Sequence, residues 1–236
     1  MLPDFAANGG NFVRVWMCSW NFPIDRQRAF NNSRYTETTG YMNASAVKRL
    51  DDVITLAESL DIKFMLCMGA GDVATDRNFF VSEEAKTRFR NRLRYIVARW
   101  GYSPAIGMWE FFNEIDNIQF RDKNNPIPAE DIVGWHTEMA KYLKSIDPFG
   151  HITTTSISHR DLAGLNSVPD LDINQKHIYN ATSVIPGTIS DYEARFGKPY
   201  VIGEFGREWD WSKNFDDFAD EMDADFRRGL WYGIFS

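Results

Sequence analysis

The chain has 236 residues, enough for one domain with a sizeable core and within the range of a single β/α barrel. It is 44% hydrophobic and 25% charged, and its 33 acidic and 26 basic residues give a net charge of −7. An acidic chain without a Lys/Arg cluster repels phosphate backbones, which argues against nucleic acid as a partner.

The sequence also bears on membranes and export. No apolar run approaches the ~20 residues that a bilayer span needs, so no membrane-spanning segment is expected. The start, Met1–Gly10, has no basic region followed by an apolar stretch, so we expect no signal peptide in this chain. That start does not by itself indicate a cytoplasmic protein, and the sequence sets no oligomeric state.

Apolar, β-rich runs alternate with segments of helical period in the first half of the chain. The run Ile62–Met68 shows no polar alternation, as expected of a strand buried on both faces. Ser82 is a favourable N-cap, followed by acidic residues in the first turn. The predicted order is a strand at 12–17, a helix at 44–60, a strand at 62–68, a helix from Ser82 to Trp100, and a strand at 105–113.

The second half continues the alternation with shorter strands. Asp147-Pro148 and Gly150 end one helix, and Gly197 ends another. The predicted order is a helix at 129–146, strands at 152–157 and 173–179, a short helix at 189–196, a strand at 200–204, a helix at 215–226, and a last strand at 230–235.

Seven predicted strands with helices between most of them indicate an α/β protein with a parallel sheet. Both an open doubly wound sheet and a closed (β/α)8 barrel of the TIM type fit this order. No GxGxxG or GxxxxGK[ST] motif is present, which weakens a nucleotide-binding doubly wound fold. In a barrel, the first strand and the last helix would lie outside this chain or be disguised in it. Residues 1–236 show no interdomain linker, so one catalytic barrel domain is predicted.

Polar residues stand at the predicted strand ends, where β/α folds carry their chemistry. Glu114 and Glu204 each follow a run of apolar residues, so a carboxylate there needs partners. Glycoside hydrolysis needs such a pair, one carboxyl to protonate the leaving oxygen and one to face the anomeric carbon. The full set of strand-end residues is Arg14, Asn113, Glu114, His177, Tyr179 and Glu204.

Three segments in this order resemble clan A glycoside hydrolases, most closely the cellulase-like family 5 and its relatives. They are Trp-Glu-Phe-Phe-Asn-Glu ending at Glu114, His-x-Tyr at His177, and Lys-Pro-Tyr-Val-Ile-Gly-Glu-Phe-Gly around Glu204. The resemblance covers almost the whole chain, from the second barrel strand to the eighth. It implies cellulase- or mannanase-like cleavage of a β-linked oligosaccharide or polysaccharide, with retention through a covalent glycosyl-enzyme. It implies no cofactor or metal, and a full-length protein that is secreted or periplasmic.

The resemblance also implies residue roles. The matched positions are Glu114 as acid/base on the fourth strand, Glu204 as nucleophile on the seventh, Asn113 as ligand of the sugar 2-hydroxyl, Arg14 near the nucleophile, Tyr179 as donor to it, and His177 as its neighbour in the pocket. Arginine and tyrosine donors would stabilise ionised Glu204. Glu114 must hold a proton, so an apolar setting that raises its pKa is expected.

Some positions depart from the family pattern. Ile115 stands where proline usually follows the acid/base, and residues 67–72 lack the usual histidine, with Asp72 as a weak substitute. Trp231 is either the eighth-strand tryptophan that floors the sugar site or a packing residue of the barrel. Trp20 and Trp209 lie in polar loops, where aromatic faces can stack on sugar rings, so both are candidate substrate contacts.

Two further groups have competing interpretations. Glu110 is four residues before Glu114, and we favour an interior carboxylate paired with Arg14 over a catalytic one. Cys18 and Cys67 fall on consecutive predicted strands, and two buried thiols are favoured over a bridge.

Two rival functions remain at this stage. A catalytically inactive relative that binds glycans or acts as a scaffold is suggested by the missing strand, by Ile115 and by the absent histidine. Another barrel enzyme, such as an aldolase or a metal-dependent hydrolase, is less favoured because no strand-end lysine or His-x-His cluster is present. The sequence does not fix the sugar.

Overall fold

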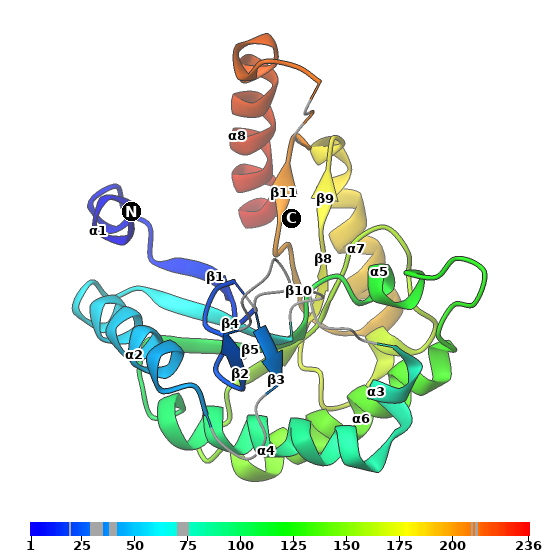
Figure 1. Cartoon of the computed structure of the whole chain (residues 1–236). Coiled ribbons are helices and arrows are strands. Elements are labelled where there is room, and N and C mark those ends of the chain that lie inside the picture. The colour runs from blue at the N-terminus through cyan, green and yellow to red at the C-terminus, as the bar shows by residue number, and fades with distance from the viewer. Residues whose placement is uncertain (19, 29–34, 38–41, 70–75, 209, 211) are drawn as a thin grey trace.

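Parallel strands alternate with helices along the chain (Figure 1). The structure is a computed structural model that describes residues 1–18, 20–28, 35–37, 42–69, 76–208, 210 and 212–236. The helices are α1 (Leu2–Ala7), α2 (Ala44–Ser59), α3 (Arg77–Val81), α4 (Glu83–Trp100), α5 (Ile115–Gln119), α6 (Ala129–Ile146), α7 (Ile185–Phe196) and α8 (Ala219–Phe235), with 3-10 turns at Leu165–Ser167, Thr182–Val184 and Phe215–Asp217. The strands are β1 (Phe12–Trp16), β2 (Arg26–Arg28), β3 (Tyr35–Glu37), β4 (Lys63–Gly69), β5 (Ile106–Phe112), β6 (Ile152–Thr154), β7 (Ser156–Ile157), β8 (Asn174–Lys176), β9 (Ile178–Tyr179), β10 (Tyr200–Val201) and β11 (Phe205–Gly206).

The parallel strands follow one another in the order of a β/α barrel wall. A four-stranded sheet has the order β1-β4-β5-β6, a three-stranded sheet the order β10-β8-β7, and β9 pairs with β11. Every pair in these sheets is parallel, whereas β2 and β3 form a separate antiparallel pair that the sequence pattern did not predict. Among the described residues the strands do not close into a ring. The predicted barrel order is therefore present as an open wall.

Helices α2, α4 and α6 cover the outer side of the four-stranded sheet (Figure 1). Each buries one stripe: Leu50 and Ile54 of α2, Leu93 of α4 and Trp135 of α6 are almost fully buried. Strand β4 is buried along nearly its whole length, as its unbroken apolar run predicts. Burial of this kind contributes about 25 cal/mol per Å² of apolar surface, so the packed helix stripes stabilise the wall that carries the strand ends.

The predicted helix boundaries agree closely with the structure where a cap marks them. The Ser82 hydroxyl accepts a hydrogen bond from the Ala85 N–H at 3.4 Å, which satisfies one orphan donor at the start of α4. Helix α6 has the predicted bounds. Helix α7 ends at Gly197, whose φ of 63° is in the left-handed region that glycine tolerates. It starts four residues earlier than predicted, at Ile185, with Pro186 in its first turn.

Two predicted strands are each interrupted once, and a third is shorter than predicted. The strand predicted at 152–157 becomes β6 and β7, the one at 173–179 becomes β8 and β9, and the one at 200–204 becomes β10, with β11 following at Phe205. The interruption falls where pairing changes, because β8 pairs with β7 and β10 while β9 pairs with β11. His177 lies at this change of partners, and its N–H donates to the Ile157 carbonyl at 2.9 Å.

The predicted strand at 230–235 is wrong. These residues belong to α8, which stands beside β11 (Figure 1). A short apolar run has no period that separates strand from helix, and Leu230, Trp231, Ile234 and Phe235 also fit i, i+3/i+4 spacing. Trp231 is therefore on a helix, with its side chain 61% exposed and its ring stacked on Phe235 at 5.6 Å between centroids. The prediction of an eighth-strand tryptophan fails with the strand.

Cys18 and Cys67 are both buried and are not joined in a disulfide. Burial raises the pKa of the Cys67 thiol well above its ordinary value, since the thiolate would be desolvated there. The interpretation as two buried thiols is confirmed.

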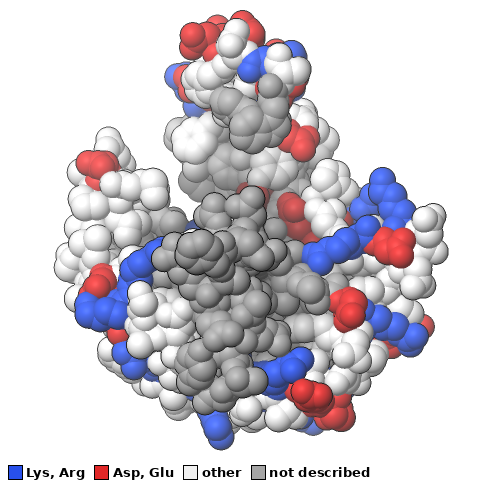
Figure 2. All heavy atoms as spheres, viewed as in Figure 1, with Lys and Arg blue, Asp and Glu red and all other residues white. Residues whose placement is uncertain are grey.

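No described helix combines the length and the apolar character required to cross a bilayer. On the face drawn in Figure 2, basic and acidic side chains of the described helices are interspersed rather than segregated. Within helices, opposite charges pair at i, i+4 spacing, as in Lys48–Asp52 of α2 and Glu84–Arg88 of α4.

His136 on α6 should make stability depend on pH. It is fully buried, its Nδ1 lies 2.8 Å from the Ile132 carbonyl, and burial lowers its pKa from 6.5 to about 4. Below pH 6.5 His136 binds a proton in the unfolded chain but stays neutral in the folded chain. The free energy of unfolding therefore decreases as the pH falls from 6.5 to 4. The loss should be about 3 kcal/mol, at 1.36 kcal/mol per pKa unit.

Urea denaturation at pH 7 and pH 4.5 measures this loss. The matched variant His136→Gln keeps a polar side chain that does not titrate, and should lose less stability over the same interval. An equal loss in both proteins would show that other groups carry the effect.

Candidate active site

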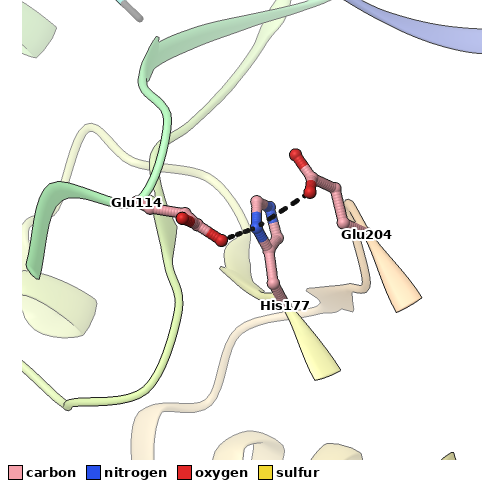
Figure 3. Close-up of side chains that lie close together, drawn as sticks. All are labelled: Glu114, His177 and Glu204. Carbon is pink, nitrogen blue, oxygen red and sulfur yellow. Dashed lines mark hydrogen bonds and ion pairs between the residues drawn. The ribbon is translucent and has the colours of Figure 1, made fainter. Parts of the chain in front are cut away.

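The predicted polar site residues lie together toward the C-terminal ends of the parallel strands; they are Arg14, Asn113, Glu114, His177, Tyr179 and Glu204. Figure 3 shows Glu114 and Glu204 on either side of His177, with interactions to both. Arg14 comes from β1, Tyr179 from β9, and Glu204 from the segment between β10 and β11. The Ile178 N–H donates to the Glu204 carbonyl at 3.0 Å, which holds the Glu204 backbone against the β8–β9 junction.

Both oxygens of Glu204 accept hydrogen bonds. Arg14 Nη1 donates to Oε1, and the Tyr179 hydroxyl donates to Oε2. Burial, and then the hydrogen bond to Glu204, raise the pKa of Tyr179, so the phenol is a neutral donor at ordinary pH. The Glu204 side chain is 25% exposed, which leaves this partnered carboxylate accessible to a ligand. The predicted contacts of Arg14 and Tyr179 with Glu204 are present.

Arg14 is shared between two carboxylates. Its Nε and Nη2 donate to Glu110 at 2.6 and 2.7 Å in a bidentate pair, and Nη2 also donates to the Asn113 Oδ1 at 2.8 Å. Burial opposes the charge on Arg14, but Glu110 outweighs it, and the pKa of Arg14 is raised. Glu110 is completely buried, so it is the interior partner of Arg14 that the sequence suggested.

Glu114 is held by its backbone as well as its side chain. Its φ of 47° and ψ of 59° are in the left-handed region, which costs a non-glycine residue about 1–2 kcal/mol. The Glu114 N–H donates to the Ser156 hydroxyl at 2.9 Å, and that hydroxyl donates to the Phe112 carbonyl at 3.2 Å. This conformation starts α5 and directs the Glu114 side chain toward His177.

The Glu114 carboxylate accepts hydrogen bonds from neighbouring side chains. His177 Nδ1 lies 2.8 Å from Oε1, and Asn117 Nδ2 lies 2.8 Å from Oε2. Burial raises the pKa of Glu114, but the hydrogen bond and electrostatic attraction of His177, together with hydrogen bonds from Asn117 and Ser158, outweigh it, and the pKa is lowered. The expectation of a raised pKa is therefore wrong, because the apolar strand before Glu114 does not reveal the polar side chains that surround its carboxylate.

The two carboxylates approach each other closely. One oxygen of Glu114, one oxygen of Glu204 and one ring nitrogen of His177 lie within 4.8 Å of one another. The His177 Nδ1 is 3.8 Å from Glu204 Oε2. Such a set of donors could in principle hold a metal ion, but the Arg14 guanidinium on Glu204 would repel a cation, and Tyr179 already donates to the other oxygen. The arrangement instead gives two nearby carboxyl groups different partners, Glu114 with His177 and Glu204 with Arg14 and Tyr179.

Several residues around the site were missed from the sequence. Asn117 is one helical turn after Glu114, a spacing that predicts proximity on a helix. Gln175 alternates with His177 and Tyr179, and residues two apart on a strand share a face. Ser156 and Asp116 carried no usable signal, because their partners are backbone groups of other segments.

Asp116 fixes the loop that follows β7. It is fully buried, and its carboxylate accepts from the backbone N–H groups of Ser158, His159 and Arg160 at 2.7, 3.0 and 3.0 Å. Asp116→Ala should therefore lower the unfolding free energy by about 3 kcal/mol, because the buried Ser158 N–H and the two part-buried N–H groups that follow it all lose their acceptor. Thermal or urea denaturation measures the effect. Asp122→Ala, in an exposed turn of the same connection, is the matched control and should change stability by less than about 0.5 kcal/mol. Equal effects would contradict the assigned role.

The tryptophans predicted as substrate contacts are less well placed. Trp20 is 55% exposed and packs edge-on against Trp16 at 6.4 Å, and Trp16 in turn lies under Arg14 at 5.5 Å. Trp231 lies on α8 rather than on a barrel strand. Trp209 and Asp72 lie outside the described residues.

Comparison with known proteins gives the family. A family profile described as cellulase, glycosyl hydrolase family 5, matches residues 1–225, so the chain belongs to this family. A mannan endo-1,4-β-mannosidase A of Podospora anserina is 24% identical over 89% of this chain and 64% of its own length. A mannan endo-1,4-β-mannosidase 1 of Oryza sativa subsp. japonica is 23% identical over 72% of this chain and 52% of its own.

Solved structures show the same fold. A family 5 mannosidase from Rhizomucor miehei superposes with a TM-score of 0.70 at 15% identity, over 97% of this chain and 70% of its own. An exo-β-1,4-mannosidase from Opitutaceae bacterium strain TAV5 superposes with a TM-score of 0.72 at 16% identity, over 98% of this chain and 45% of its own. The fold is thus the predicted barrel type. The chain spans 64% of the length of the Podospora relative and 36% of that from Hypocrea jecorina.

Proposed function

We propose that this chain is the catalytic part of a retaining hydrolase of β-linked glycans, with Glu204 as nucleophile and Glu114 as acid/base. The observation that carries the proposal is the pair of carboxylate oxygens within 4.8 Å on either side of His177. Carboxylate oxygens that approach within 4.8 Å are compatible with the ~5–5.5 Å separation of the carboxyl groups in retaining glycosidases, whereas inverting enzymes separate these groups by ~6.5–9.5 Å to admit a water.

The first step forms a glycosyl ester. The Glu204 carboxylate attacks the anomeric carbon as the bond from that carbon to the leaving oxygen breaks, and Glu114 gives its proton to that oxygen. The guanidinium of Arg14 and the hydroxyl of Tyr179 donate to the two oxygens of Glu204 and orient it for this attack. The half-buried Asn113, positioned by Arg14, is suited to bind the sugar 2-hydroxyl.

The second step restores both residues. Glu114, now ionised, takes a proton from water, the water oxygen bonds to the anomeric carbon, and the ester bond to Glu204 breaks. The hydrogen bonds from His177 and Asn117, which lower the pKa of Glu114, favour its ionised form in this half of the cycle. In the first half the same bonds oppose proton retention, so we expect turnover to be fastest at acid pH.

The substrate class we propose is a β-1,4-linked mannan. The support is the activity of the relatives, which include mannan endo-1,4-β-mannosidases and an exo-β-1,4-mannosidase. By the same resemblance we propose a secreted or periplasmic protein.

The test is an assay of the purified chain on mannan, β-glucan and galactan, with the anomeric form of the first product followed by ¹H NMR. We expect release of β-configured reducing ends from mannan before mutarotation. First products of α configuration would exclude retention. No turnover on any glycan, with binding of mannan by calorimetry, would instead favour the inactive glycan-binding relative.

A further inference from the structure

Gln175 lies beneath the candidate site, between two of its residues. The side-chain Nε2 is 3.3 Å from Glu110 Oε1 and 3.4 Å from His177 Nε2, and the residue is 1% exposed. Room for this amide depends on Gly203, where a Cβ would come within 2.0 Å of the Gln175 Nε2. The absence of a side chain at Gly203 thus leaves room for the Gln175 amide beside the His177 ring.

The orientation of this amide follows from Glu110. The Gln175 Oε1 has no hydrogen-bond partner among the described residues, so the reverse orientation must be considered. It would place the carbonyl oxygen against the Glu110 carboxylate, which already carries the charge that pairs with Arg14. Two acceptors at that distance repel, so the NH₂ group faces Glu110, and the same NH₂ group faces the His177 Nε2.

An NH₂ group that faces Nε2 requires a lone pair there. A neutral imidazole with its proton on Nδ1 meets this requirement and still donates to Glu114 at 2.8 Å. An imidazolium, or the tautomer with its proton on Nε2, would instead place the His177 Nε2–H against the Gln175 NH₂, and two donors facing each other repel. We propose that Gln175 is a positioning residue that keeps His177 neutral, with its one proton on Nδ1 and directed at Glu114. This inference deepens the proposed function and rests on it for its catalytic consequence.

The charged and titratable groups around His177 show why its protonation state matters for the proposed mechanism. Glu114 lies on one side at the end of β5, Glu204 lies 3.8 Å away on the other with Arg14 and Tyr179 bound to it, and Glu110 lies behind Gln175. An imidazolium beside Glu114 would remove the proton that Glu114 must donate. Gln175 opposes this outcome by making the second protonation of His177 unfavourable.

Nitrogen NMR of the chain labelled with ¹⁵N-histidine tests the tautomer without any substrate. The chain has four histidines. The pair of ring-nitrogen signals that is missing from the spectrum of His177→Gln belongs to His177. At pH 7 we expect a protonated Nδ1 and an unprotonated Nε2. A proton on Nε2, alone or in an imidazolium, would overturn the proposal.

Two variants test the cause. Gln175→Met keeps the length of the side chain without a donor, and should lose the excess of the Nδ1-protonated form. Gln175→Glu places an acceptor against Nε2, and should convert His177 to the imidazolium at pH 7. Gln119→Met is the matched control, since its buried amide donates to the Ile127 carbonyl away from the site, and the His177 signals should not change. Unchanged signals in both Gln175 variants would also overturn the proposal.

Kinetics on mannan then measure the consequence. In Gln175→Glu the alkaline limb of the kcat/KM profile should move to lower pH by about one unit or more, with a smaller change in KM, because an opposite charge now faces Glu114. An unshifted limb in a variant whose His177 is an imidazolium would overturn the catalytic consequence. If the unmodified chain hydrolyses no glycan, the proposed function fails, whereas the NMR result still decides the role of Gln175.

Discussion

Glu204→Ala should reduce hydrolysis of mannan by about 10⁵-fold, because the covalent step loses its nucleophile. The cavity left by the carboxylate lies beside Arg14, whose guanidinium can hold a small anion. Added azide should therefore restore turnover of an activated aryl β-mannoside, and the product should be the α-glycosyl azide. Product analysis by NMR and initial rates with and without azide measure both effects.

A matched control separates this loss from a general effect of removing a glutamate. Glu130→Ala changes an exposed residue in the first turn of α6, and should leave activity unchanged. Wild-type activity in Glu204→Ala would end the assignment of the nucleophile. A β-configured azide product would show that azide enters from the other face and would contradict attack in place of Glu204.

Glu114→Ala should have the second largest effect, and its size should depend on the leaving group. A general acid contributes about 10²–10⁴-fold, and its absence matters most when the leaving oxygen is basic. Hydrolysis of mannan, which leaves a sugar alkoxide, should fall by about 10³-fold or more. Formation of the glycosyl-enzyme from a dinitrophenyl glycoside should fall much less, and is measured by the burst of the phenolate.

The pH profile gives an independent check on the same residue. Because the pKa of Glu114 is lowered, the alkaline limb of the unmodified chain should fall in the acid range, where Glu114 loses its proton. In Glu114→Ala that limb should disappear for the activated substrate. A limb that persists unchanged would assign the acid to another residue, and an equal loss on both substrates would argue for a structural defect.

The helices and the first strands could be predicted because their signals are local. Leu50 and Ile54 recur at helical spacing, and Ser82 caps α4 with its own hydroxyl. The last predicted strand failed because Leu230 and Trp231 fit either period, and only contacts with distant segments decide between them. The interruption near His177 also depends on which neighbours pair, and the sequence does not contain that information locally.

The site was predictable as far as strand ends could be located. Arg14, Tyr179 and Glu204 meet because parallel strands end at one edge. The lowered pKa of Glu114 could not be predicted, because it depends on His177 and Asn117 approaching within hydrogen-bond distance. The role of Gln175 depends on the absence of a Cβ at Gly203, a contact between strands that pattern alone does not reveal.

The bidentate pair of Arg14 with Glu110 has a consequence for the proposed catalytic cycle. At rest, one cation lies between two anions, and the group of three carries a single negative charge. When Glu204 becomes an ester it is no longer charged. The group of three is then neutral, and Arg14 remains paired with Glu110. If Arg14 were paired with Glu204 alone, its guanidinium would become an unpaired buried charge whenever the glycosyl ester forms, at a cost of about 3–5 kcal/mol. In the proposed cycle Glu110 therefore keeps Arg14 paired while the glycosyl ester exists.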